Sequence, residues 1–267
     1  MIRRRVIGCL LGLLFLTGIH TKVAVAVYVM DNGVRTDHVA FNKIETEVVD
    51  MLAGEVRLAT AKRSEDHATL VAGLIVECAP RVKLISVRTL KNGTGSWSSF
   101  LKGVHWISNH HPAGQPAVAN LSLGGVPKDP RIEKLVVRAI NQLVEDGVTV
   151  VVAAGNDGVD VMHRIPSTLD SVISVGATSA LNSRLISSNY GSCVDIYALG
   201  ENLAGPGSKS TTHRTRDSGT SISAAVVTGS VAAFLEAQPT AEPNEAKQWL
   251  IEKSEVGKVK NFPGPGS

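Results

Sequence analysis

The chain has 267 residues, of which 43% are hydrophobic and 19% are charged. This composition is typical of a globular protein and excludes intrinsic disorder as the overall state, and the length suits one large α/β domain. The formal net charge of +3, from 27 basic and 24 acidic residues, is too small a bias to indicate binding to nucleic acid. We therefore expect a folded domain with no nucleic-acid partner.

The N-terminal segment has the pattern of an export signal. Three arginines at positions 3–5 precede an apolar run over residues 6–16. This run is shorter than the roughly 20 apolar residues that a membrane-spanning helix needs. We predict a signal peptide over residues 1–21, a secreted protein without a stable membrane anchor, a folded domain over 22–258 and a flexible tail over 259–267.

The three cysteines do not form a dense disulfide framework. Cys9 lies in the predicted signal peptide, so Cys78 and Cys193 can form one bridge at most. The sequence does not supply the Cα separation that decides whether they pair, and the question stays open.

Apolar, β-branched stretches recur along the chain and predict strands that are buried on both faces. They cover residues 23–30, 82–87, 117–123, 148–154 and 172–175. Helical patterns lie between them, the clearest over residues 132–144 with Gly147 as a stop signal, whereas residues 200–218 have the composition of a loop. The alternation predicts a three-layer α/β/α fold with a mostly parallel central sheet and a site at the carboxyl ends of the strands.

Two candidate residues carry acid–base chemistry. Asp31 ends the first predicted strand and precedes Asn32-Gly33. A buried carboxylate there needs a hydrogen-bonded partner, which a histidine would supply, although a turn-initiating role is the alternative. His67 begins a short helical pattern with small residues. Its imidazole can accept and return a proton near neutral pH, although a solvated or packing role is the common alternative.

Two further candidate residues lie where negative charge could be stabilised. Ser221 lies at the N-terminal end of the apolar run over residues 226–236, where free N–H groups and the helix dipole favour an anion. A simple N-cap is the alternative. Asn156 follows a predicted strand in a glycine-rich loop, and its amide can donate to an oxyanion. Ordinary turn chemistry is the alternative there.

The order Asp31, His67, Asn156, Ser221 resembles that of the subtilase family. Four further segments agree with this resemblance, and the last two are especially similar to the proteinase K branch: residues 86–90, 93–97, 120–125 and 187–197. The resemblance covers about residues 23–254. It implies a subtilisin-like fold and a secreted serine endopeptidase that forms an acyl-enzyme, with Asp31, His67 and Ser221 as catalytic residues and Asn156 as an oxyanion donor.

The same resemblance implies how a substrate binds. Two edge segments, Gly93-Thr94-Gly95 and Ser122-Leu123-Gly124, would hold a polypeptide in extended conformation between them. Ala154 and Gly155 would line an open, mostly apolar primary pocket. We carry over no metal site and no cofactor, because the chain between residues 73 and 84 lacks the calcium-binding loop of the family, and we expect a monomer.

The segment around His67 departs from the family pattern. The family has glycine on both sides of the histidine and a second histidine three positions later, where this chain has Asp66, Ala68 and Leu70. We expect the Asp66 carboxylate to lie beside the imidazole and to favour its protonated form. Together with the short segment before Asp31, which leaves no room for the family's propeptide, these changes support an alternative hypothesis: a catalytically weak or inactive subtilase-fold protein that binds peptides or a protein partner.

Overall fold

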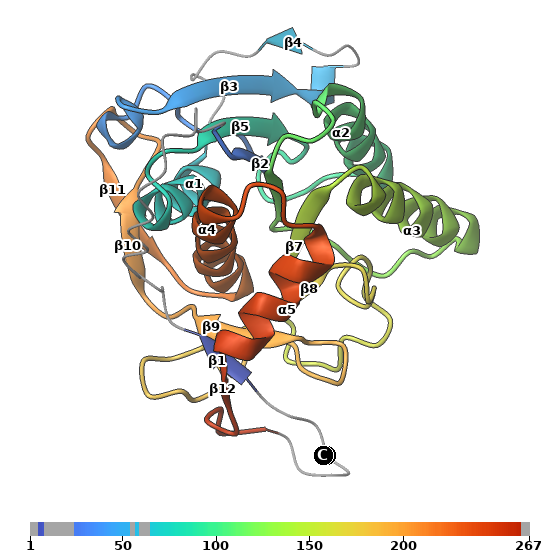
Figure 1. Cartoon of the computed structure of the whole chain (residues 1–267). Coiled ribbons are helices and arrows are strands. Elements are labelled where there is room, and N and C mark those ends of the chain that lie inside the picture. The colour runs from blue at the N-terminus through green and yellow to red at the C-terminus, as the bar shows by residue number, and fades with distance from the viewer. Residues whose placement is uncertain (1–4, 8–23, 54–56, 59–64, 263–267) are drawn as a thin grey trace.

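A computed structural model describes residues 5–7, 24–53, 57–58 and 65–262 (Figure 1). Its centre is a ten-stranded sheet. The strands of this sheet are β1 (Arg5–Ile7), β2 (Ala26–Asp31), β3 (Glu45–Asp50), β4 (Arg57–Leu58), β5 (Lys83–Arg88), β6 (Ala117–Leu121), β7 (Val148–Ala153), β8 (Ile173–Thr178), β9 (Ile196–Leu199) and β12 (Glu255–Val256). They follow the order β12-β1-β9-β8-β7-β6-β2-β5-β3-β4. All neighbours from β1 to β3 are parallel, and β12 and β4 add antiparallel edges.

Helices cover both faces of the sheet, so the predicted three-layer α/β/α architecture is confirmed (Figure 1). One face carries α1 (Asp66–Cys78), α4 (Thr220–Ala237) and α5 (Pro243–Lys253). The other face carries α2 (Trp97–His110) and α3 (Pro130–Glu145). Two separate apolar cores result, one on each side of the sheet, which explains why the central strands are apolar at nearly every position.

The five predicted strand segments correspond to β2, β5, β6, β7 and β8. The predicted helix over 132–144 lies within α3, which begins at an Asp129 cap followed by proline and ends before Gly147, at a φ of 91°. Residues 200–218 are more regular than a loop, because β10 (Leu203–Pro206) and β11 (Arg214–Asp217) pair there as an antiparallel hairpin. Two short 3₁₀ helices, η1 (Val39–Phe41) and η2 (Met51–Ala53), complete the described elements.

Helix α4 is the central element of the first core. It is long and apolar enough to cross a membrane by length and composition, but 78% of it is buried inside the protein. It crosses α1 closely, because a Cβ at Gly229 would lie 2.6 Å from Cys78 Cβ and 2.9 Å from the Ile75 carbonyl oxygen. A core helix buried on all sides explains its uniform hydrophobicity.

Described residues outside both predicted domain boundaries are part of the fold. Of the predicted signal peptide, the structure describes only Arg5–Ile7, as strand β1 between β9 and β12. At the other end, residues 259–262, which the sequence predicts to belong to the flexible tail, pack onto the domain. Val259 is 5% exposed, and the Phe262 ring meets Tyr197 edge to face with centroids 5.3 Å apart. The packed domain therefore extends beyond residue 258. Cys193 is a free thiol, so it does not pair with Cys78.

The direction of the chain reverses beside β2. The chain places β3 and β5 on one side of β2 and then crosses to β6 on the other. A crevice opens at such a switch point, outside the carboxyl ends of the parallel strands. Asp31 is the last residue of β2 and therefore lies at this edge.

Candidate active site

The Asp31 side chain is buried and directed at His67. The His67 Nδ1 atom lies 3.0 Å from both carboxylate oxygens, and its hydrogen bond goes to Oδ1. The Asn32 backbone N–H donates to the same oxygen over 2.6 Å. Because an ionised carboxylate only accepts, Nδ1 must carry the proton, which leaves Nε2 as the proton-accepting atom of the neutral ring.

The charge around His67 is strongly negative. Burial of the ring favours its neutral form, but the charge and hydrogen bond of Asp31 outweigh burial and raise the pKa of His67 to about 9, with smaller contributions from Asp217 and Glu65. Asp66 is not among these groups. Its carboxylate instead accepts from Ser208, so the expectation that it lies against the imidazole is wrong. The reason is geometric: neighbouring residues on a helix point in directions about 100° apart.

Ser221 is the second residue of α4 and is 7% exposed. The helix begins after Gly219, which has a φ of 138° and provides no side-chain cap, so the positive end of the helix dipole lies at the serine. A simple N-cap role for Ser221 does not apply, because the cap position belongs to Gly219. No hydrogen bond joins Ser221 to His67 in the described residues.

The orientation of Asn156 is set by Thr220. The Asn156 Oδ1 atom accepts from the Thr220 backbone N–H over 2.9 Å and from its hydroxyl over 3.1 Å. The same hydroxyl accepts from the Gly155 N–H over 3.1 Å. Because the oxygen of the amide is held in this way, its NH₂ group remains the donor end of the side chain. A Cβ at Gly219 would lie 3.0–3.3 Å from this amide, so the glycine leaves room for it.

A cleft of about 700 Å³ brings together the predicted substrate-binding residues. Its lining includes all of Gly93, Thr94, Gly95, Ser122, Leu123, Gly124, Ala154 and Gly155, together with Asn156 and Ser221. Neither edge segment forms one of the named strands, although Thr94 makes a β-bridge with Lys91. Trp97 and Phe100 add aromatic surface that sequence reasoning missed. Asp31 and His67 are not among the lining residues.

Two supporting residues were also missed. Thr220 orients Asn156, as described above. Asn189 is fully buried, donates to the Ala154 carbonyl over 2.8 Å and accepts from the backbone N–H groups of Asp157 and Val159. It thereby shapes the loop that presents Asn156. Nothing in the spacing of the sequence indicates these contacts, because each joins segments at least 30 residues apart.

Comparison with known proteins identifies the family of the chain. The profile of the subtilase family matches residues 22–266. The chain belongs to the subtilase family. A curated relative of this subtilase is the "Extracellular serine proteinase" of Thermus sp. (strain Rt41A), which is 36% identical over 90% of this chain and 58% of its own length. The "Alkaline serine exoprotease A" of Vibrio alginolyticus is 32% identical over 90% of this chain and 44% of its own.

Solved structures show the same fold. A cold-adapted subtilisin-like serine proteinase superposes on the subtilase chain with a TM-score of 0.79 and 28% identity, covering 91% of this chain and 87% of that one. The subtilisin-like fold predicted from the sequence is therefore confirmed. The chain spans about half the length of the curated relatives that it matches.

Proposed function

We propose that this subtilase is a serine endopeptidase that hydrolyses extended polypeptides through an acyl-enzyme. The observation that carries the proposal is the contact between His67 Nδ1 and the Asp31 carboxylate, at 3.0 Å. This contact fixes the tautomer whose Nε2 accepts a proton from a hydroxyl. Asn156 and Ser221 lie along one cleft with both proposed substrate edges, which supports peptides rather than small esters as substrates.

The proposed reaction has two halves. Ser221 Oγ attacks the peptide carbonyl carbon while His67 Nε2 takes the hydroxyl proton, and the resulting oxyanion accepts hydrogen bonds from the Asn156 NH₂ and the Ser221 backbone N–H. The C–N bond then breaks as His67 returns the proton to the leaving amine. Water, deprotonated by His67 Nε2, then attacks the acyl carbon. The ester bond to Ser221 Oγ breaks, His67 returns the proton to that oxygen, and the carboxylic acid leaves. The mechanism requires His67 Nε2 and Ser221 Oγ to come within hydrogen-bond distance when substrate binds, as catalytic hydrogen bonds often tighten only in the substrate complex.

Labelling with a fluorophosphonate probe tests this function. The full chain should be labelled on Ser221, and Ser221→Ala should abolish labelling and peptide hydrolysis. Ser98→Ala is a matched control, because Ser98 is an exposed serine that is likewise the second residue of a helix. A well-folded chain that neither labels nor cleaves peptides would refute the proposal and favour a peptide-binding protein without activity.

We also propose that the protein is exported by its N-terminal segment and acts outside the cell as a monomer. The relative from Thermus is named extracellular, which supports this location. Removal of residues 1–21 would also remove β1 and leave β9 as a sheet edge. N-terminal sequencing of protein from culture medium tests the idea, and a secreted chain that still begins at Met1 would contradict cleavage.

A further inference from the structure

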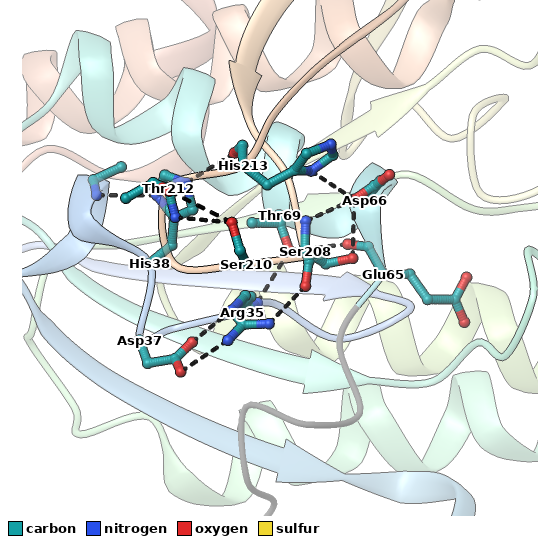
Figure 2. A network of polar contacts seen from close by, with 11 residues as sticks. Arg35, Asp37, His38, Glu65, Asp66, Thr69, Ser208, Ser210, Thr212 and His213 are labelled. Atoms are coloured by element: carbon teal, nitrogen blue, oxygen red, sulfur yellow. Dashed lines mark hydrogen bonds and ion pairs between the residues drawn. The ribbon is translucent and has the colours of Figure 1, made fainter.

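The turn of the β10–β11 hairpin, residues 207–213, contacts the chain segments next to two of the proposed catalytic residues, Asp31 and His67 (Figure 2), and strand β11 of the hairpin leads toward the third, Ser221. Arg35 lies four residues after Asp31, and its Nη1 donates to the Ser208 carbonyl over 2.8 Å. Asp66 immediately precedes His67, and β11 ends at Asp217, four residues before Ser221. A shift of one of these segments would therefore move the hairpin and, through it, the other segments.

Asp66 is the residue that joins this turn to α1. Its Oδ1 atom accepts from the Ser208 backbone N–H over 2.6 Å and from the Ser208 hydroxyl over 2.9 Å. His213 Nδ1 lies 3.5 Å from the same oxygen. Figure 2 shows the carboxylate directed at Ser208 and His213. Three polar groups of one turn thus converge on one carboxylate oxygen.

The remainder of the hairpin fits against the same face of α1. Asp66, Leu70 and Gly73 lie on one stripe of the helix, because positions i, i+4 and i+7 share a face. A Cβ at Gly205 would lie 2.6 Å from Leu70 Cδ1, and a Cβ at Gly73 would lie 2.2 Å from Pro206. The two family departures, Asp66 and Leu70, therefore lie at a single interface with the hairpin.

The other polar contacts at the start of α1 go to segments other than the hairpin. Its N-cap residue, Glu65, makes no side-chain capping hydrogen bond, but its Oε1 atom accepts from the Asn92 N–H over 2.8 Å and its N–H donates to the Gly33 carbonyl over 3.1 Å. The Thr69 hydroxyl donates to the Glu65 carbonyl over 2.9 Å and accepts from the Arg35 N–H over 3.0 Å. The Asp31 contact restrains only one nitrogen of the His67 ring, so the aim of Nε2 depends on where this first turn lies.

We propose that Asp66 is a positioning residue, whose carboxylate clamps the β10–β11 hairpin to the first turn of α1 and thereby aims His67 at Ser221. The inference rests on the proposed peptidase function. Asp66 itself acts through the backbone and does not touch the reacting atoms. Burial opposes ionisation, but the hydrogen bonds from Ser208 and the charges of His213 and Lys209 hold the pKa of Asp66 below its usual value, so the clamp persists where His67 is neutral.

Steady-state kinetics of three variants test the clamp. Asp66→Ala should lower kcat by about 10- to 100-fold, because a small misplacement of a catalytic group costs that much, while KM changes by less than about twofold. The kcat of Asp66→Asn should lie between those of Asp66→Ala and the wild-type protein, since an amide oxygen still accepts from Ser208. Asp37→Ala is the control: Asp37 is an exposed carboxylate of the same network that pairs with Arg35 over 2.9 Å. Equal kcat values for Asp66→Ala and Asp37→Ala would overturn the proposal.

A second measurement separates positioning from stability and from the proposed function. In the Ser221→Ala background, the NMR signal of the His67 Nδ1–H proton reports the imidazole directly. Asp66→Ala should shift or broaden this signal while the amide spectrum stays that of a folded protein. A lower melting temperature with an unchanged signal and an unchanged kcat would refute the clamp.

This measurement remains decisive if the wild-type chain neither labels nor cleaves peptides, because it needs no activity. That outcome would refute the proposed peptidase function, and the NMR comparison would still test whether Asp66 positions His67. If Asp66→Ala does not fold, Asp66→Gly removes the same carboxylate and restores the glycine of the family pattern, and an unchanged His67 signal in that variant would refute the clamp.

Discussion

The pH dependence of activity follows from the negative charge around His67. In the proposed mechanism only the neutral imidazole can accept the Ser221 proton, and the pKa of His67 is raised to about 9. At pH 7 about 1% of the rings would then be neutral, against about three quarters at the ordinary pKa of about 6.5. We expect kcat/KM at pH 7 to lie about 100-fold below its plateau and to rise about tenfold per pH unit up to about pH 9.

Variants that each lack one carboxylate test whether the nearby negative charge raises the pKa of His67. Asp217→Asn and Glu65→Gln should each move the midpoint of the rise to lower pH, because both carboxylates raise the pKa of His67. Asp217 is exposed, so its effect should shrink as salt is added. Glu77→Gln is the matched control, an exposed carboxylate near the other end of α1. A wild-type midpoint at or below pH 6.5 would refute the reasoning.

The same group links pH to stability. Since the folded-state pKa of His67 is raised, its stabilising contribution is fully present below pH 6.5 and is lost as pH rises through about 9. Urea unfolding of Ser221→Ala, which avoids self-digestion, should show this loss, and the double variant with His67→Ala should not. A pH-independent difference between the two proteins would contradict the assignment.

Three further changes probe other contacts. Thr220→Val should remove one of the two hydrogen bonds that hold the Asn156 amide oxygen and leave the Gly155 N–H unpaired, while the backbone N–H of residue 220 still donates to Asn156; we expect turnover to fall by up to about 10²-fold and stability to fall by about 1–3 kcal/mol in urea unfolding. Asp50→Ala should destabilise the fold by about 3–5 kcal/mol, because Arg88, which bonds Asp50 over 2.9 Å, is left buried without its partner; unchanged urea unfolding would contradict this. Burial lowers the pKa of His111, against the charge of Asp146, and neither ring nitrogen is hydrogen-bonded to a described residue, so the contribution of the neutral ring to stability should be full above pH 6.5 and fall below it. His111→Phe should flatten this acid limb in thermal unfolding, and a limb of unchanged steepness would exclude His111 as its cause.

The central strands and the order of layers could be predicted from the sequence, because strands buried on both faces need apolar side chains at nearly every position. Strand β3 contains two glutamates and lacks that pattern, so its place in the sheet depends on partners far along the chain, whereas β9 is apolar but only four residues long, which is too short a run to be recognised by pattern alone. The sequence predicts residues 259–262 as part of the tail for the same reason, because the partner against which they pack lies far along the chain. Only the folded sheet end supplies the Tyr197 ring that Phe262 packs against.

The candidate site divides in the same way. The sequence by itself determined which residue types could carry the chemistry, because Asp31, His67, Asn156 and Ser221 each follow or precede a recognisable strand or helix. Only the tertiary structure decided where their neighbours point: Thr220 fixes the Asn156 amide across 64 residues, and Asp66 turns from His67 toward Ser208 across 142 residues. The physical reason is that local pattern records burial and backbone conformation, whereas the direction of a hydrogen bond depends on a partner that arrives only when distant segments meet.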